Sequence, residues 1–453
     1  MGKETVHLIV NPVAGHGKAP EVVASHVIPI LDHFSIPYKQ HITTAPRDAG
    51  HIGQSISKHH HAASSESGDK ITVIIAGGDG TTHDFIEGVL DLTGKGQGQW
   101  EIVILPLGTA NALYSSLFPP SAPSPTYNSL KSLSHPPPDD ILPKLYSLFA
   151  YLDKSSSPLS LPITLTSLLP PEATPANQET DPCSSTIVVP SHVVLSTSLH
   201  ASILQISETL RSAHPGPERF RLAAQQSASK FFDAKAKLFP TMTTIDGSGG
   251  GEVEQWDLRK GKFVKPFTTT TLHTEKDGGH ILDGPFAYFL STSTVDRLEP
   301  TFVISPPTSL HPDTSTDIHA QSKQRWIYLT VLRPLRDPAV SSSSPEERGE
   351  IWSKRAFEVL GQAYQQGSHI NLTYSTNATA TEVKGEGEVV VELFRCGSFE
   401  WIPLDNQQRQ EGEGDGSRLV CADGALHLIP SGGRAKVDLR DPTEGGWSFA
   451  IWA

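Results

Sequence analysis

The first 118 residues repeat one pattern, a short apolar run followed by a segment with helical spacing. Strand-like runs occur at residues 6–10, 37–44, 71–76 and 101–108, and helical segments are expected at residues 23–34, 47–63, 85–90 and from 109 onward. Strands that alternate with helices favour a parallel sheet covered by helices on both faces. The pattern therefore predicts an α/β domain at the start of the chain.

The composition changes after Phe118. Residues 119–137 and 155–186 are rich in Pro and Ser, and a helix is expected between them at 141–153. From residue 187 strand-like runs dominate, with a helical region expected at 202–238 and exposed loops near 250 and at 337–350. These changes predict two domains: an α/β domain over residues 1–153 with an insertion near 119–137, and a β-rich domain with insertions over 187–440. The sequence leaves open a return of residues 441–453 to the first domain.

Charge and cysteine content exclude several classes. The chain has 453 residues and a net charge of -13, which argues against a nucleic-acid-binding surface. Three cysteines without a CxxC pair suit a reducing compartment and provide no disulfide framework. No apolar run approaches the roughly 18 residues of a transmembrane helix, and the N-terminus lacks the pattern of a signal peptide. We therefore expect a cytoplasmic protein without a transmembrane segment.

Three glycine-bearing loops follow the predicted strands: "NPVAGHGKA" at 11–19, "GGDGTTHD" at 77–84 and "PLGTANAL" at 106–113. The carboxyl ends of parallel strands meet at one edge of a sheet, where ligands bind. Each loop also opens a helix, whose first N–H groups and positive dipole end favour an anion. Any one loop alone could be an ordinary turn, but together they predict a polyphosphate site. "AGHGKA" does not have the spacing of a Walker P-loop, which disfavours a P-loop NTPase.

Taken together, the three loops resemble the diacylglycerol kinase catalytic domain, a superfamily that includes sphingosine kinases, ceramide kinases and bacterial lipid kinases. The matching residues are Asn11, Pro12 and Gly15; Gly77, Gly78, Asp79, Gly80 and Thr81; and Pro106, Gly108, Thr109 and Asn111. The resemblance implies a Rossmann-like, nucleotide-binding α/β domain followed by a β-rich sandwich domain that receives the lipid. NAD kinases share the GGDGT motif, which cannot by itself separate the two families.

The second half favours lipid kinases, and among them sphingosine kinases. Residues 197–223 resemble the stretch that carries substrate and nucleotide contacts, and this resemblance places Arg211 and Arg219 on the ATP-binding arginines. The alternative is that both arginines pair with Glu208 and Glu218 on a helical surface. "VCADGALHLIP" at 420–430 resembles the C-terminal "DGE" element that returns to the nucleotide, which implicates Asp423.

Two substitutions depart from the pattern of the family. Ser202 stands where sphingosine kinases have the Asp that recognises the substrate amine, and a neutral hydroxyl cannot pair with an ammonium group. Uncharged alcohols such as diacylglycerol or ceramide are therefore favoured over a sphingoid base. Ala425 replaces the Glu of the "DGE" element, which would weaken activity if that Glu helps to organise Mg²⁺ or the nucleotide.

The candidate site follows from these motifs. A carboxylate in a glycine loop beside phosphates can accept the proton of the acceptor hydroxyl or orient a metal, and the resemblance assigns Asp79 the role of the base; a turn aspartate is the alternative. Ser202 is the predicted substrate-binding residue, and the metal ligands are unknown. The predicted nucleotide-binding residues are Asn11, Pro12, Gly15, Thr43, Gly77, Gly78, Gly80, Thr81, Gly108, Thr109, Asn111, Arg211, Arg219 and Asp423.

The leading hypothesis is an ATP- and Mg²⁺-dependent kinase that phosphorylates a lipid alcohol (diacylglycerol, ceramide or a sphingoid base) at a membrane surface, with which it associates transiently. The first alternative is a catalytically weak regulator of the same fold that binds nucleotide or lipid. The second is an NAD kinase. No nucleic-acid partner is expected, and the sequence leaves open a homodimer.

Overall fold

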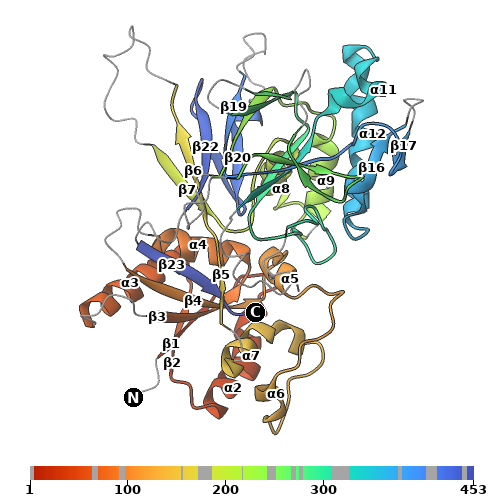
Figure 1. Cartoon of the computed structure of the whole chain (residues 1–453). Helices are drawn as coiled ribbons and strands as arrows, with labels where there is room; N and C mark the ends of the chain where they lie inside the picture. Colours follow the sequence, from red (N-terminus) through yellow and green to blue (C-terminus); the bar gives the residue numbers. More distant parts are fainter. Residues whose placement is uncertain are drawn as a thin grey trace, which may run out of the picture.

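Figure 1 shows the computed structural model of the chain. It describes residues 5–63, 70–90, 97–154, 157–171, 186–216, 218–241, 251–266, 272–274, 279–308, 326–375, 380–404, 416–440 and 446–453. The described residues form a lower unit that contains both ends of the chain and an upper unit built from its middle part (Figure 1). No helix in these ranges is long and apolar enough to cross a membrane.

The lower unit is built on a six-stranded sheet with the order β2-β1-β3-β4-β23-β5. Its strands are β1 (Val6–Val10), β2 (Tyr38–Ile42), β3 (Lys70–Gly77), β4 (Gln97–Pro106), β5 (Leu159–Ser160) and β23 (Gly446–Ile451). All neighbouring pairs are parallel except β23 and β5. The predicted parallel α/β fold is therefore confirmed. The last strand, β23, comes from the end of the chain and pairs with β4.

Helices cover both faces of this sheet. Crossovers between parallel strands are right-handed, which places the helices before and after β2 on opposite faces. One face carries α1 (Ala19–Val22), η1 (Val23–Val27) and α2 (Ile28–His33) (Figure 1). The other face carries α3 (Asp48–Ala63) and α4 (Asp79–Val89), which pack together. The segment after β4 contains α5 (Ala112–Leu117), α6 (Asn128–Lys131), η2 (Leu142–Lys144) and α7 (Tyr146–Asp153). Strand β3 is almost entirely buried, as expected for a sheet covered on both sides.

The upper unit is a sandwich of two antiparallel sheets, which confirms the predicted β-rich sandwich. One sheet has the order β11-β10-β18-β15-β14-β8-β20-β21 and the other β12-β13-β9-β19-β22-β6-β7. The first contains β8 (Leu195–Thr197), β10 (Glu254–Asp257), β11 (Lys262–Val264), β14 (Tyr288–Thr292), β15 (Ile327–Leu332), β18 (Glu392–Cys396), β20 (Leu419–Ala422) and β21 (Ala425–Leu428). The second contains β6 (Thr164–Leu169), β7 (Ile187–Ser191), β9 (Ala234–Phe239), β12 (Leu272–Thr274), β13 (His280–Asp283), β19 (Ser398–Pro403) and β22 (Arg434–Leu439).

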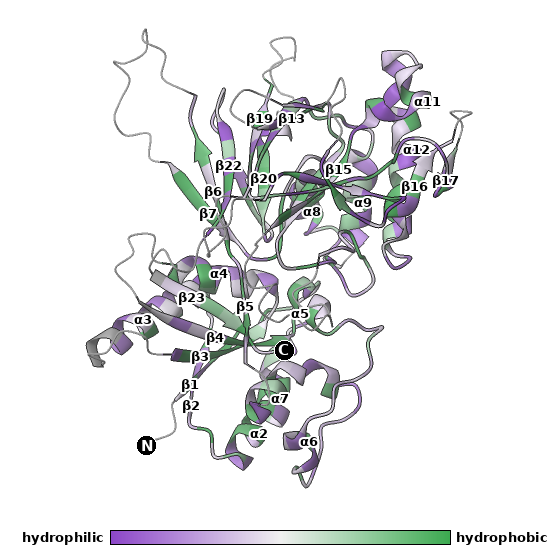
Figure 2. Ribbon diagram, viewed as in Figure 1, coloured by the Kyte–Doolittle hydropathy of each residue, from purple (hydrophilic) through white to green (hydrophobic). Residues whose placement is uncertain are grey.

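Aromatic side chains fill the space between the two sheets of the sandwich. The rings of Phe289 on β14 and Trp401 on β19 have centroids 4.9 Å apart, and Phe289 and Phe399 are 5.4 Å apart. All three side chains are essentially buried. Figure 2 shows that α4 and α12 carry hydrophobic and hydrophilic residues along their length, as helices that pack on a core with one face do.

The helices of the upper unit correct two expectations. The region 202–238 contains α8 (Ser198–Leu210) and α9 (Glu218–Ser227), but its end is strand β9, in which buried and more exposed residues alternate. Residues 337–350, expected as an exposed loop, contain α11 (Pro338–Ser341) and the start of α12 (Pro345–Ala363). Ser344 precedes a proline and two glutamates there, which favour a helix N-terminus. Short elements complete the unit: η3 (Pro334–Arg336), η4 (Ser368–Asn371), β16 (Leu372–Tyr374), β17 (Thr381–Val383) and η5 (Gly416–Arg418).

Candidate functional site

The three motif loops meet at the carboxyl ends of β1, β3 and β4. The side-chain amide of Asn11, after β1, donates to the hydroxyl of Thr81 on α4 at 2.9 Å. The N–H of Leu107, after β4, donates to the carbonyl oxygen of Gly77 at 2.9 Å. These bonds fix the first loop to the second and the second to the third, so the sheet edge and the loops form one unit.

Glycines allow the loops to approach closely. A Cβ atom on Gly108 would stand 2.3 Å from the Cα of Gly78, and one on Gly15 would stand 2.5 Å from the carbonyl oxygen of Leu107. Gly15 also has a positive φ of 58°. At Gly80, by contrast, a Cβ would meet nothing within 4 Å. The glycines thus bring the backbones together and leave open space beside the first turn of α4.

Asp79 lies in the first turn of α4, after the N-cap residue Gly78. Its carboxylate accepts the N–H of Ala112 at 2.7 Å and the N–H of Leu113 at 3.2 Å, which are the first amides of α5. Burial raises the pKa of Asp79 above its ordinary value, against the hydrogen bond from Ala112 and the charge of His192. One carboxylate therefore joins the N-terminal ends of two helices.

Asn111 shapes the third loop. Its φ of 54° lies in the left-handed region, which Asn tolerates better than most residues. Its side-chain oxygen accepts the N–H of Gly108 at 2.9 Å, and its side-chain nitrogen donates to the Gly108 carbonyl oxygen at 3.0 Å. The side chain of Asn111 is therefore held by Gly108, the glycine that packs closely against Gly78.

The remaining predicted residues of these loops differ in exposure. Thr43 and Thr81 are buried, Asn11 and Pro12 are half-buried, and Gly15, Gly80 and Thr109 are exposed. Ser202 is buried on α8, which packs against β20. In the described part of the chain, no hydrogen bond joins Ser202 to the three loops.

The two predicted arginines have different surroundings. Arg211 is exposed and forms a bidentate ion pair with Glu208, at 2.5 Å and 2.8 Å. Arg219 is buried and donates to the carbonyl oxygens of Pro215 and Gly216 at 2.9 Å and 3.2 Å, while its Nε has no partner. Glu218 pairs instead with Arg221. The alternative of an ion pair with a neighbouring glutamate therefore holds for Arg211 and not for Arg219.

Asp423 lies between β20 and β21, and its carboxylate is surrounded by donors. The backbone N–H groups of His192, Val193 and Val194 donate to it at 2.9, 2.9 and 2.8 Å. The ring nitrogens Nδ1 of His192 and His83 lie 2.7 Å and 3.1 Å from its Oδ2. Since His83 belongs to α4, this buried cluster joins the α/β domain to the sandwich.

The electrostatics of the cluster follow from these contacts. Although burial acts to raise it, the charges and hydrogen bonds of His192 and His83 hold the pKa of Asp423 well below its ordinary value. Burial acts to lower the pKa of His83, but the hydrogen bond and charge of Asp423 raise it above its ordinary value. Neither histidine was predicted from the sequence. His83 follows the GGDGT motif by one helical turn from Asp79, which is the one signal that could have pointed to it.

The cluster of His83, His192 and Asp423 does not fit Mg²⁺. Their candidate ligand atoms all lie within 4.8 Å of one another. However, both Asp423 oxygens already accept backbone N–H groups, and the contacts to the rings have hydrogen-bond lengths. Mg²⁺ also prefers oxygen ligands in a regular octahedron, and two imidazoles do not provide them. The cluster is therefore a hydrogen-bonded network.

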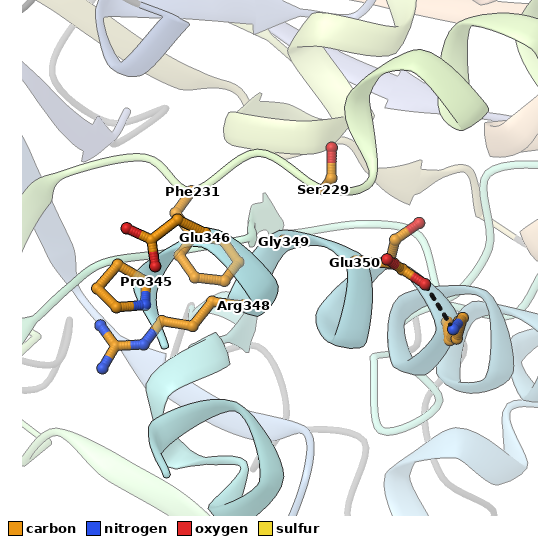
Figure 3. A pocket seen from close by; sticks show the side chains of 9 residues that line it. Ser229, Phe231, Pro345, Glu346, Arg348, Gly349 and Glu350 are labelled. Atoms are coloured by element: carbon orange, nitrogen blue, oxygen red, sulfur yellow. Dashed lines mark hydrogen bonds and ion pairs between the residues drawn. The ribbon is translucent and has the colours of Figure 1, made fainter. Parts of the chain in front are cut away.

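Two cavities differ in their relation to the loops. A cavity of about 830 Å³ begins at Pro106 and Asn111 of the third loop and is lined further by Tyr114, Phe118 and several prolines of the 119–137 insertion. A second cavity, of about 770 Å³, lies between Ser229 and the start of α12, with Glu350 and Lys354 paired at its edge (Figure 3). The second cavity contains none of the predicted site residues.

Comparison with known protein families gives a match for the first domain. Residues 5–136 match the family model described as "Diacylglycerol kinase catalytic domain". This match confirms, for residues 5–136, the resemblance inferred from the three loops. The family is one of kinases, which transfer phosphoryl groups.

Individual proteins are similar over different extents. Sphingosine kinase 1 from Homo sapiens is 29% identical over 118 residues, which are 25% of this chain and 27% of that protein. Two crystal structures from Bacillus anthracis str. Sterne, one titled a diacylglycerol kinase and one a putative diacylglycerol kinase, are 13% and 12% identical, with TM-scores of 0.43 and 0.47. Both alignments cover 100% of this chain and 98% of the other. Yeast NADH kinase, crystallised with NADH, is 11% identical, with a TM-score of 0.36 over 100% and 85% of the two chains.

Proposed function

We propose that this protein is an ATP-dependent lipid kinase that transfers the γ-phosphoryl group of ATP to a hydroxyl group of a lipid alcohol. The observation that carries the proposal is the meeting of the three family loops around residues 77–81, in which the Asp79 carboxylate holds the start of α5, within residues that match the model of a diacylglycerol kinase catalytic domain. In this proposal Asp79 is the base that accepts the hydroxyl proton as the oxygen attacks phosphorus and ADP leaves.

The loop geometry supports a nucleotide at the first turn of α4. The first amides of an α-helix have no partner within the helix, and they favour an anion. Gly80 leaves open space beside them, and the exposed hydroxyl of Thr109 lies in the neighbouring loop. The amides of α5 are different, because the Asp79 carboxylate already occupies two of them. ATP phosphates would therefore be held at α4 and by the glycine backbones of the loops.

Arg219 supports a second contact to ATP. A buried guanidinium group costs free energy unless it is paired, and within the described ranges no carboxylate pairs with Arg219. Its free Nε would satisfy its hydrogen-bonding capacity on a nucleotide oxygen. Arg211 already has Glu208 as a partner and would contribute less. Mg²⁺ would arrive with ATP and neutralise phosphate charge, and no protein ligand is assigned to it.

Two features support an apolar, uncharged acceptor. The cavity that begins at Asn111 is lined largely by prolines and aromatic side chains, which suit a hydrocarbon chain. Ser202 carries no charge with which to recognise an amine, so diacylglycerol or ceramide is favoured over a sphingoid base. The acceptor would be reached by transient association with a membrane surface.

A catalytically weak regulator is the second candidate, because Ala425 contributes no carboxylate and Arg211 is already paired. The test is transfer of labelled γ-phosphate from Mg²⁺-ATP to sphingosine, ceramide, diacylglycerol and monoacylglycerol in mixed micelles, with NAD as a parallel aqueous acceptor. Asp79→Asn is compared with Asp257→Asn, a matched change on a distant hairpin. The kinase proposal predicts label in the organic phase that Asp79→Asn abolishes and Asp257→Asn retains. ATP binding without transfer would support the regulator, and label in aqueous NADP would support an NAD kinase.

A further inference from the structure

The loop that follows β14 is held in shape by an ion pair between two adjacent residues. Both Nε and Nη2 of Arg297 donate to the carboxylate of Asp296, at 2.8 Å and 2.7 Å. The remaining guanidinium nitrogen, Nη1, donates to the carbonyl oxygen of Pro300 at 3.0 Å. Arg297 is only 6% exposed, so these contacts are shielded from water. A buried guanidinium group with all three nitrogens engaged fixes residues 296–300 as one rigid turn.

This ion pair also reaches the α/β domain. The hydroxyl of Ser116, on α5, donates to the Asp296 carboxylate at 2.9 Å, and its oxygen accepts the N–H of Asp296 at 3.3 Å. At its other end α5 is held by the Asp79 carboxylate, which accepts the first two amides of the helix. Hydrogen bonds to charged groups are stronger than those between neutral groups. The helix is therefore fixed at its start by a motif loop and near its end by the upper unit.

The same turn forms part of the wall of the cavity that begins at the third motif loop. Helix α5 lines this cavity of about 830 Å³ with Tyr114 and Leu117. Among the lining residues in the described part of the chain, only Pro300 belongs to the upper unit. Since Arg297 holds the carbonyl group of Pro300, the two walls of the cavity are joined through the hydrogen bonds of the Asp296 carboxylate.

The connection brings no net charge to the cavity wall. Asp296 and Arg297 neutralise each other, and the hydroxyl to which they are anchored is uncharged. Pro300 adds an apolar ring to the prolines and aromatic side chains of the lining. The charged side chains of the lining are Asp140 and Lys144, and neither is buried. A wall of this kind suits an uncharged hydrocarbon chain.

We propose that Asp296 and Arg297 are positioning residues that, anchored on Ser116, hold Pro300 in the cavity wall and so determine how tightly the cavity binds the acyl chain of an uncharged glycerolipid acceptor. This inference rests on the proposed function, in which the cavity receives the acceptor. The two residues act only through Pro300 and α5. In the same proposal ATP is held at α4 and by the glycine loops, so loss of the connection is expected to affect the lipid and not the nucleotide.

The activity test is the KM of Ser116→Ala for dioctanoylglycerol and for ATP. Loss of a hydrogen bond to a charged group is expected to raise the lipid KM by about tenfold, while the KM for ATP stays within about twofold of the wild type. Ser116→Thr keeps the hydroxyl and is expected to restore the lipid KM. The matched control is Ser132→Ala, because that hydroxyl bonds within its own turn, to the carbonyl oxygen of Ser129. An unchanged lipid KM, a parallel rise of both KM values, or no rescue by Ser116→Thr would overturn the proposal.

A second readout does not depend on activity. Lipid binding is measured without ATP, by fluorescence anisotropy of a diacylglycerol that carries a fluorophore on one acyl chain. The Kd is expected to be about tenfold higher in Ser116→Ala than in the wild type. Should Ser116→Ala fail to fold, Pro300→Ala shortens the wall itself and is expected to raise the Kd as well. A wild-type protein that binds this probe but transfers phosphate to no alcohol would refute the proposed function, while the two Kd values still decide the role of the ion pair. Equal Kd values, or no binding of the probe by the wild type, refute that role.

Discussion

Replacement of Asp423 by Asn should loosen the segment that joins β7 to β8. The carboxylate accepts five hydrogen bonds, three of them from the consecutive amides of His192, Val193 and Val194 and two from imidazole rings. An Asn side chain has the same shape but one acceptor oxygen. Its NH₂ group takes the place of one carboxylate oxygen, and each of these oxygens accepts at least two of the five bonds. The NH₂ group would therefore face at least two N–H donors in either orientation of the amide.

The magnitude follows from this geometry. The side chain of Asp423 is fully buried, so the abandoned donors cannot turn to water. Removing one partner of a buried charged pair costs roughly 3–5 kcal/mol, and we take the lower end, about 3 kcal/mol, because the Asn oxygen keeps part of the network. Since each 1.4 kcal/mol is about a tenfold change in an equilibrium constant, local opening should become roughly a hundredfold more frequent.

Hydrogen exchange detected by mass spectrometry measures this opening directly. Peptides that contain residues 192–194 should exchange about a hundredfold faster in Asp423→Asn than in the wild type. Asp257→Asn, on the hairpin of β10 and β11, is the control and should leave these peptides unchanged. A difference of less than about threefold, which is below 1 kcal/mol, would show that the network does not hold this segment.

Three further changes test other parts of the account. Gly108→Ala places a Cβ 2.3 Å from the Cα of Gly78 in the facing loop and should weaken ATP binding by about tenfold or more. The control Gly361→Ala meets nothing within 4 Å and should leave ATP binding unchanged. Isothermal titration calorimetry measures both affinities. Arg219→Gln should raise the Kd for ATP by at least about tenfold, because it removes a buried charge-assisted contact. Arg211→Gln should raise it by less than about threefold, because Arg211 is exposed and paired with Glu208. Equal effects would contradict the proposed role of Arg219 in binding ATP. The raised pKa of His83 means that its pairing stabilises the fold fully below about pH 6.5 and less as the pH rises through the raised value. The Tm difference between the wild type and His83→Gln should therefore shrink from about pH 6 to about pH 9, and a constant difference would refute this linkage.

The sequence carries enough information for the first domain and its loops. Strand β3 is a largely apolar run that ends at Gly77 and is followed by Gly78, and periodicity and turn chemistry are both local properties. The meeting of Gly78 with Gly108 also follows from topology, because adjacent parallel strands end at the same edge. Periodicity does not specify which carbonyl and amide groups of the loops form hydrogen bonds with each other. These pairs depend on the positions that the backbone takes in the folded domain.

The histidine cluster could not be predicted in this way. His83 and Asp423 are 340 residues apart, and their contact depends on how the sandwich is seated on α4. The start of α12 was predictable in principle, because Ser344, Pro345 and two glutamates are a helix-start pattern, but the preceding run of serines suggested a loop. The end of the 202–238 region was misassigned for a different reason. Its alternation from Ala234 is a strand pattern that sheet pairing with β13 and β19 stabilises.

Phosphoryl transfer to lipids is tested most directly by ³¹P NMR of the lipid extract after the 453-residue protein has been incubated with Mg²⁺-ATP and micellar diacylglycerol or ceramide. We expect a new phosphomonoester resonance that grows with time and is absent with Asp79→Asn. If the extract shows no phosphomonoester from any lipid alcohol although ATP binds, the claim that these loops transfer phosphate to lipids is contradicted.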